Sequence, residues 1–258
     1  MLKINNLSKK FNVGTDNELT VFDGFNLTIN KGECTGILGA NGCGKSTLFN
    51  IISGVLTQDE GDILLNDVNI NNLKESERSK FLGRVHQNPS MGVSPSLTIL
   101  ENISLSDKKC HKFGLRKLIN KNKIDEFKEI LKTLDLGLEN MLNSEVKFLS
   151  GGQRQSLSLL MATMKKPELL LLDEHTAALD PKTSRLIMDK TKELIQNHSL
   201  TAMMISHNVR DALNYSDRII MLDKGNVVLD VKSKDINENE LMKIYNSRNY
   251  ESSFQEAV

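Results

Sequence analysis

Alternation of apolar and polar residues predicts β-structure at the start of the chain. Residues 2–4 and 22–29 alternate as half-buried strands do. Residues 34–38 are a short apolar segment, which predicts a buried strand. Residues 46–53 place Leu48, Ile51 and Ile52 on one side and are predicted to be a helix.

The middle of the chain has a helical pattern instead. Ile124, Phe127, Leu131 and Leu134 are spaced by 3, 4 and 3 residues, which places them on one helix face. Residues 155–164 predict a second helix. Since strands are predicted on both sides of this block, residues 90–164 are expected to form an inserted helical subdomain.

Strand patterns return after the helical block. Residues 169–172 are four consecutive leucines, typical of a central parallel strand. Residues 201–205 and 218–222 predict two more strands, and a turn at 224–226 leads into another apolar segment. Residues 232–258 are polar and predict a helical tail. The pattern favours an α/β class with a mostly parallel sheet and flanking helices.

Composition narrows the functional classes. The chain has 258 residues, 39% of them hydrophobic and 26% charged, which suits a globular domain with one insertion. Lysine plus arginine equals aspartate plus glutamate at 33 each, so no nucleic-acid partner is expected. No apolar run approaches the roughly 18 residues that would suggest a membrane span. The first residues lack the apolar stretch of a secretory leader, and Cys34, Cys43 and Cys110 lack metal-type spacing. A reducing cytoplasm is therefore expected.

A glycine-rich segment after the predicted strand at 34–38 fits the phosphate-binding spacing G-x-x-x-x-G-K-S. Its backbone N–H groups and the start of the next helix would face an anion. Lys45 is predicted to reach the β- and γ-phosphates of ATP, and the hydroxyl of Ser46 to bind Mg²⁺. The alternative is a chance glycine-rich turn, which its place between strand and helix disfavours. The predicted nucleotide contacts are Gly39, Asn41, Gly42, Cys43, Gly44, Lys45, Ser46 and Thr47.

Two acidic residues follow the leucine strand. Asp173 is at its carboxyl end, where open α/β sheets bind ligands, and is predicted to hold Mg²⁺ through water. Glu174 is predicted to orient and deprotonate the attacking water. The alternative is an ordinary acidic pair at a strand end.

A second anion site is predicted at Leu149-Ser150-Gly151-Gly152-Gln153. Ser150 and the N–H groups of Gly151 and Gly152 precede a helix, as the glycines of the first site do. The alternative is a flexible turn. Since one chain cannot easily close both sites on one phosphate, we expect a head-to-tail homodimer with two ATP molecules between the chains.

Together these motifs, in this order, resemble the ATP-binding subunits of ABC transporters over residues 1 to about 231. The resemblance implies a P-loop NTPase core (1–89 and 165–231) with an N-terminal antiparallel β subdomain, and a helical signature subdomain (90–164). It also implies a role for five more positions: Phe11 stacks on adenine, Gln87 contacts Mg²⁺ and the water, Gln153 completes the signature loop, Asp180 belongs to the D-loop, and His207 contacts the γ-phosphate.

The resemblance further implies partners and a location. The ATPase would bind integral-membrane permease subunits at the cytoplasmic face of the membrane and, through them, serve an extracytoplasmic solute-binding protein. Residues 88–98 and 173–183 resemble bacterial importers of the tryptophan and tyrosine type. His175 stands where many family members have proline, and Ser156 and Met161 where many have arginine.

Other functions stay open from sequence alone. An ABC exporter would share every motif, because nothing in the cassette fixes the direction of transport. A soluble ABC protein of translation or DNA repair is disfavoured by a single cassette with only 61 residues between Gln87 and Leu149. A non-enzymatic regulator is disfavoured by the complete set of catalytic residues. Cys43 is either a redox-sensitive thiol or a small residue that fills a tight turn.

Overall fold

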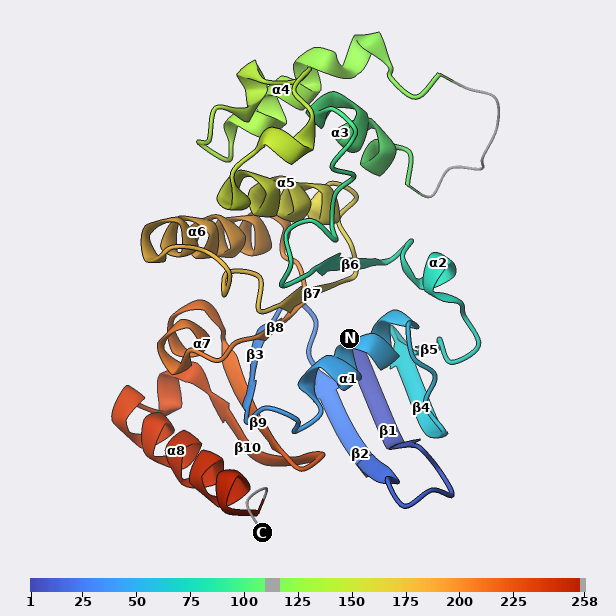
Figure 1. Ribbon diagram of the computed structural model, residues 1–258, viewed down its shortest axis with the longest axis vertical. Coiled ribbons are helices and arrows are strands. Elements are labelled where there is room, and N and C mark those ends of the chain that lie inside the picture. Colours follow the sequence, from blue (N-terminus) through green and yellow to red (C-terminus); the bar gives the residue numbers. More distant parts are fainter. Residues whose placement is uncertain (110–116, 256–258) are drawn as a thin grey trace. The chain divides into compact units, whose positions relative to one another are not determined.

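The computed structural model describes residues 1–109 and 117–255, with side chains up to Arg248; Cys110 lies outside the described residues. The chain divides into two compact units, residues 1–79 with 199–258, and residues 80–198. Figure 1 labels their helices and strands. Among the described residues, no helix is long and apolar enough to cross a bilayer.

The first unit contains an antiparallel sheet in the order β2-β1-β4-β5. Its strands are β1 (Leu2–Phe11), β2 (Leu19–Ile29), β4 (Glu60–Leu65) and β5 (Val68–Asn69). Leu2 lies opposite Ile29 on one side and Leu65 on the other, and all three are buried. This alternation of buried positions is the one that the sequence predicts, although β1 and β2 extend beyond the predicted ranges.

A second sheet in the same unit is mostly parallel. Its central strand β3 (Cys34–Gly39) is buried throughout and pairs in parallel with β8 (Ala202–Ile205) and β9 (Arg218–Asp223). The strand β10 (Asn226–Lys232) is antiparallel to β9. A parallel strand with neighbours on both sides is apolar on both faces, which explains why residues 34–38 do not alternate.

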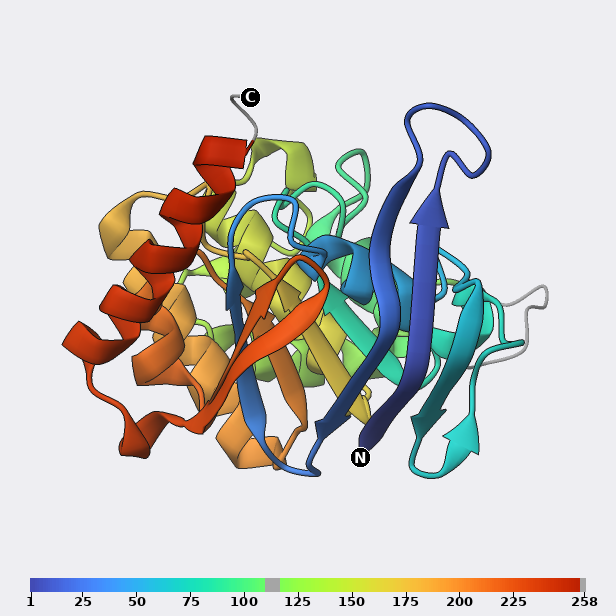
Figure 2. The same ribbon diagram turned by 90° about the horizontal axis from the view of Figure 1, so that it is seen from below.

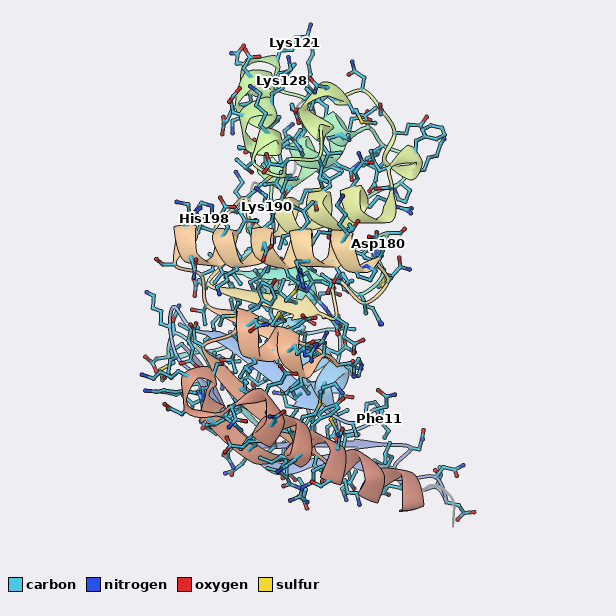
Figure 3. All side chains as sticks on the ribbon, turned by 90° about the vertical axis from the view of Figure 1, so that its left-hand side faces the viewer. Phe11, Lys121, Lys128, Asp180, Lys190 and His198 are labelled. Atoms are coloured by element: carbon cyan, nitrogen blue, oxygen red, sulfur yellow. The ribbon has the colours of Figure 1, made fainter. Side chains whose placement is uncertain are left out.

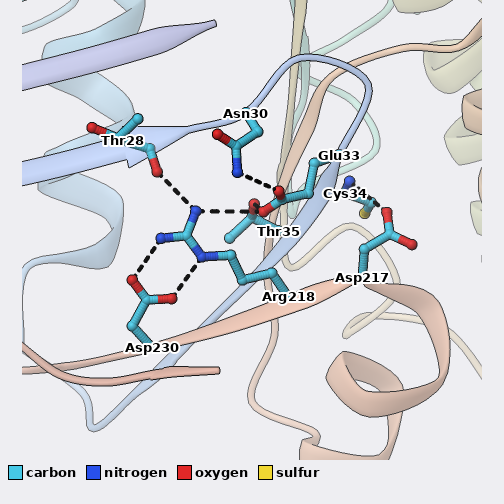
Figure 4. A network of polar contacts seen from close by, with 8 residues as sticks. All are labelled: Thr28, Asn30, Glu33, Cys34, Thr35, Asp217, Arg218 and Asp230. Carbon is cyan, nitrogen blue, oxygen red and sulfur yellow. Dashed lines mark hydrogen bonds and ion pairs between the residues drawn. The ribbon is translucent and has the colours of Figure 1, made fainter. Parts of the chain in front are cut away.

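Arg218, the first residue of β9, joins these strands to the antiparallel sheet (Figure 4). Its guanidinium binds both carboxylate oxygens of Asp230 on β10, at 2.6 and 2.5 Å. It also donates to the carbonyl of Thr28 on β2 at 2.9 Å and lies 3.5 Å from the carboxylate of Glu33. A planar group with five donors can hold three segments at once, which an ammonium would do less well.

The helices of the first unit are α1 (Lys45–Ser53), α2 (Glu75–Arg78), α7 (Val209–Tyr215) and α8 (Glu238–Gln255), and a 3-10 turn spans Ser233–Asp235. Figure 2 shows α8 along the sheet of β3, β9 and β10. Leu241 of α8 joins Leu38, Ala212 and Ile219 in one buried cluster. The tail therefore contains a helix over Glu238–Gln255, which packs through a small apolar face.

The second unit combines two parallel strands with helices. Strand β6 (Leu82–Val85) pairs with β7 (Leu169–Asp173). The helices are α3 (Ile99–Asp107), α4 (Ile124–Lys132), α5 (Gly151–Thr163) and α6 (Pro181–His198), with 3-10 turns at Lys121–Lys123, Leu138–Asn140 and Val146–Phe148. Phe127 and Leu131 of α4 lie in a buried cluster with Ile103 of α3 and Leu157 of α5. The predicted helix face is therefore confirmed for Ile124, Phe127 and Leu131, whereas Leu134 lies beyond the end of α4 and is buried in the same cluster.

Candidate nucleotide-binding site

The glycine segment forms a tight loop between β3 and α1 in the first unit. Gly39 has φ +151°, and a Cβ atom there would lie 2.3 Å from the carbonyl oxygen of Leu222. Gly44 has φ +108°, and its Cβ would lie 2.8 Å from the ring of Phe22. Any side chain at either position would clash, so the loop requires glycine at both. The first turn of α1 carries no acidic residue, which leaves its positive end open to an anion.

Lys45, the first residue of α1, is folded back over this loop. Its ammonium donates to the carbonyls of Gly39 and Ala40, both at 2.8 Å, and the residue is only 5% exposed. Ser46 is exposed and Thr47 is half-buried at the same helix end, while Asn41 and Gly42 are exposed on the loop. The positive charge, the hydroxyls and the helix N-terminus therefore lie together, as a phosphate site needs.

Cys43 packs inside the loop rather than at its surface. Cys43 is 5% exposed, and its thiol lies 3.8 Å from the ammonium of Lys45. Burial raises the pKa of the Cys43 thiol, against the opposing effect of Lys45. A thiol with a raised pKa is a poor redox sensor, so the structure favours the interpretation of Cys43 as a small residue that fills a tight turn.

Phe11 and His207 belong to the same unit. Phe11 ends β1 and is half-buried, with the ammonium of Lys9 5.5 Å from its ring centroid; Figure 3 labels it. His207 is exposed just after β8. Because Ile37 of β3 lies opposite Ile205 of β8 in a parallel pair, the glycine loop and His207 leave the sheet at the same edge.

Asp173 ends β7 in the second unit, where the sequence predicts it. One of its carboxylate oxygens, Oδ2, accepts a hydrogen bond from the guanidinium of Arg84 on β6 at 3.0 Å. The side chain of Asp173 is 14% exposed and that of Arg84 is 15% exposed. Arg84 is a neighbour that sequence analysis misses, because only the pairing of β6 with β7 brings it beside Asp173.

Glu174 and Gln87 are brought together. Val85 of β6 lies opposite Leu172 of β7, so the residues after both strands leave the sheet at one edge. The amide nitrogen of Gln87 donates to Oε2 of Glu174 at 3.0 Å. Glu174 has φ +46°, a left-handed conformation that is uncommon for a residue with a side chain.

The signature residues form the start of α5. The hydroxyl of Ser150 accepts from the backbone N–H of Gln153 at 3.2 Å, and the Gln153 side chain accepts from the N–H of Ser150 at 3.0 Å. This reciprocal pair is a capping box. A Cβ on Gly152 would lie 2.3 Å from the methyl group of Thr183 on α6, so Gly152 allows the two helices to approach. Ser150 itself is exposed, and the first turn of α5 has no acidic residue.

Asp180 lies directly before the first residue of α6, and His198 is the last residue of that helix (Figure 3). Its carboxylate accepts from the backbone N–H of Thr183 at 3.1 Å, and the hydrogen bonds from Thr183 lower the pKa of Asp180. Asp180 therefore caps α6 as a carboxylate.

The chemistry of these side chains fits Mg²⁺, which binds hard oxygen ligands. Because the amide nitrogen of Gln87 donates to Glu174, its carbonyl oxygen is left for a cation. The hydrogen bond from Arg84 engages Oδ2 of Asp173 and leaves Oδ1. The described residues contain no group of three or more His, Cys, Asp or Glu side chains that could hold a metal, so the nucleotide and water would have to complete the coordination.

His175 follows Glu174 and is buried, with 2% of its surface exposed. Its Nε2 lies 3.1 Å from the hydroxyl of Thr191 on α6, and that hydroxyl donates to the carbonyl of Ile187 at 2.7 Å. Because the hydroxyl proton is used, Nε2 must donate, which assigns the neutral Nε2–H tautomer. Burial lowers the pKa of His175 from 6.5 to about 4.

This burial predicts a dependence of stability on pH. Between pH 6.5 and about 4 the unfolded chain binds a proton at His175 and the folded chain does not, so stability is complete above pH 6.5 and falls with falling pH. At pH 5 the expected loss from this group is roughly 2 kcal/mol. Measured by urea unfolding, the free energy of unfolding of His175→Gln should lose this part of its dependence on pH. The variant His198→Gln, at an exposed position, should show the same pH dependence as the parent. Equal slopes for parent and His175→Gln would contradict the assignment.

Comparison with known proteins identifies the family. A family profile described as ABC transporter matches residues 22–177, more than half of the chain. The chain belongs to the ABC transporter family. As a member it is an ATP-binding and ATP-hydrolysing subunit that powers a membrane transporter, and the fold and class predicted from its motifs are confirmed.

Individual relatives agree with this assignment. The chain is 46% identical over 235 residues to a "Tyrosine transport ATP-binding protein" of Clostridioides difficile, covering 91% of this chain and 93% of the relative. It is 35% identical to a "Phosphonates import ATP-binding protein" of Alcaligenes faecalis, covering 98% and 90%. A dimeric ATP-binding cassette solved in a post-hydrolysis state with ADP and phosphate matches with a TM-score of 0.77 at 31% identity, covering 90% and 99%.

Proposed function

We propose that this ATPase powers a bacterial importer for an aromatic amino acid such as tyrosine. The observation that carries the proposal is the 46% identity to a tyrosine transport ATP-binding protein over nearly the full length of both chains. Phosphonate and spermidine/putrescine import proteins are similar at 35%, which supports import as the direction. The chain would bind its permease subunits at the cytoplasmic face of the membrane, and through them serve a solute-binding protein outside.

The roles of the site residues follow from their chemistry. Lys45 is already held by carbonyls of its own loop, and we propose that it moves to the β- and γ-phosphates of ATP when they enter. Phe11 stacks on the adenine ring. Ser46, Asp173 and Gln87 hold Mg²⁺, which neutralises charge on the phosphates.

Glu174 is the general base in this proposal. Its carboxylate takes a proton from the attacking water, while the hydrogen bond from Gln87 orients it. His207 contacts the γ-phosphate as charge develops there. The residues of the glycine loop, from Gly39 to Thr47, supply the N–H donors around the phosphates.

The signature loop acts on the nucleotide of a second copy of the chain. The open N-terminus of α5, with Ser150 as its cap, provides an anion site that matches the one at α1. Gly151, Gly152 and Gln153 complete it, and Asp180 lies in the D-loop. Two ATP molecules then join two chains head to tail, and hydrolysis removes the bridging phosphate and opens the dimer.

Purification from membranes tests the proposal. A tagged chain with Glu174→Gln, expressed in its own host and extracted in mild detergent with ATP, should carry a permease and a lipoprotein-type binding protein. The isolated binding protein should gain thermal stability with tyrosine and not with phosphonate or spermidine. Recovery of ribosomal proteins in place of a permease would contradict the transporter role, and stabilisation by another solute would contradict the cargo.

A further inference from the structure

Gln155, two residues beyond the signature loop on α5, is fully buried, with 0% of its surface exposed. Its amide nitrogen donates to the backbone carbonyl of His86 at 3.0 Å. The next residue along the chain is Gln87, whose own amide donates to Glu174 at 3.0 Å. One buried side chain therefore joins the signature helix to the segment that orients the general base.

The signature loop is connected to Gln155 through the first turns of α5. Ser150 and Gln153 cap each other, and α5 continues without a break from Gly151 to Thr163. Arg154 adds a weaker link, from its guanidinium to the hydroxyl of Ser90 at 3.4 Å. A displacement of the signature loop would thus move the amide of Gln155, and with it the backbone that precedes Gln87.

Stability alone does not explain a glutamine at this position. Its carbonyl oxygen, Oε1, is buried and has no hydrogen-bond partner among the residues that the structure describes. An unpaired buried acceptor costs free energy that an apolar side chain of the same size would avoid. The hydrogen bond to His86 is the contact that an apolar side chain could not supply.

We propose that Gln155 is a positioning residue. When one nucleotide binds the signature loop, Gln155 transmits this binding to Gln87 and Glu174, which act on the other nucleotide. This inference rests on the proposed head-to-tail dimer, in which each chain's signature loop contacts the ATP bound by its partner. Gln155 would then link the two ATP sites through the interior of a single chain. Because its side chain is fully buried, it would act by positioning Gln87.

The test compares Gln155→Leu with Thr163→Val in the full chain. Leucine keeps the volume and loses the donor, whereas Thr163 is a buried α5 residue whose hydroxyl donates to the carbonyls of Leu159 and Leu160 of its own helix. Gln155→Leu should lower kcat about tenfold, the effect of one well-placed hydrogen bond, and reduce the Hill coefficient for ATP from near 2 toward 1. Its melting temperature and the ATP affinity of the isolated monomer should equal or exceed the parent's.

Three results would overturn the inference. They are an unchanged kcat and Hill coefficient, a lower kcat with an unchanged Hill coefficient, and the same losses in Thr163→Val. Each of them leaves the proposed function intact, provided that the parent hydrolyses ATP cooperatively. A parent chain that hydrolyses ATP with no cooperativity would instead contradict the dimer, and with it both proposals.

Discussion

Replacing Glu174 by glutamine is expected to lower the kcat for ATP hydrolysis by about 10³-fold, within the range for the loss of a general base. The carboxamide has the same shape and still offers an oxygen to the amide of Gln87, which donates to Glu174 at 3.0 Å. It cannot take a proton from water. ATP binding should therefore be retained, and the ATP-bound dimer should persist because nothing removes the bridging phosphate.

Three measurements on the purified chain check this result: steady-state phosphate release, equilibrium ATP binding, and sedimentation with and without ATP. Glu126→Gln is a suitable control, because Glu126 is exposed in the first turn of α4 and has no role in the site. The control should hydrolyse ATP as the parent does and remain monomeric after turnover. Parent-like hydrolysis by Glu174→Gln would show that another group activates the water.

Replacing Arg78 by methionine is expected to lower the free energy of unfolding by about 4 kcal/mol, as for a buried polar network that loses its central group. Arg78 is 2% exposed. Its guanidinium donates to the carbonyls of Ile51 and Ile52 at 2.7 and 2.9 Å, and to those of Leu73 and Asn71 at 3.0 Å each. The carbonyls of Ile51 and Ile52 lie at the C-terminal end of α1, the helix that begins at Lys45. A positive charge is favourable at this end of a helix.

Methionine fills much of the same space but leaves four carbonyls without this donor, two of them in buried hydrogen bonds. Arg78→Lys should lose most of the same stability, because an ammonium cannot reach four acceptors arranged around a planar guanidinium. Denaturant unfolding at pH 7.5 measures both variants. The control Arg185→Met, at an exposed position on α6, should stay within about 0.5 kcal/mol of the parent. A loss below about 1 kcal/mol for Arg78→Met would mean that water replaces the guanidinium.

The sequence is informative where function depends on local chemistry. The glycines, Lys45 and Ser46 must be close in the chain to form one loop, so their spacing alone predicts the loop and the helix after it. Gly39 shows the reason directly, because a side chain there would meet the backbone at Leu222. Burial also leaves a local signal: the four consecutive leucines predict the buried strand β7, and the 3- and 4-residue spacing predicts the buried face of α4.

The residues that sequence analysis misses depend on tertiary contacts. Arg78 is one of many charged residues in the sequence, and only the path of the chain brings it to the end of α1, 26 residues earlier. Arg84 meets Asp173 only through strand pairing. Gln155 lies in a helix that was predicted, but its contact with His86 spans 69 residues. Such side chains carry no periodic or motif signal before the fold is known.

The central claim is that the signature loop of one chain and the glycine loop of another meet across ATP. It is tested most directly by mixing two variants of the chain. Both carry Glu174→Gln and have their native cysteines replaced by serine. One variant adds Ser150→Cys and the other adds Asn41→Cys, and both of these positions are exposed. After ATP binding is verified, a short bismaleimide should yield a cross-linked dimer from the mixture with ATP, and not from either chain alone. The same yield without ATP, or none with it, would contradict the account.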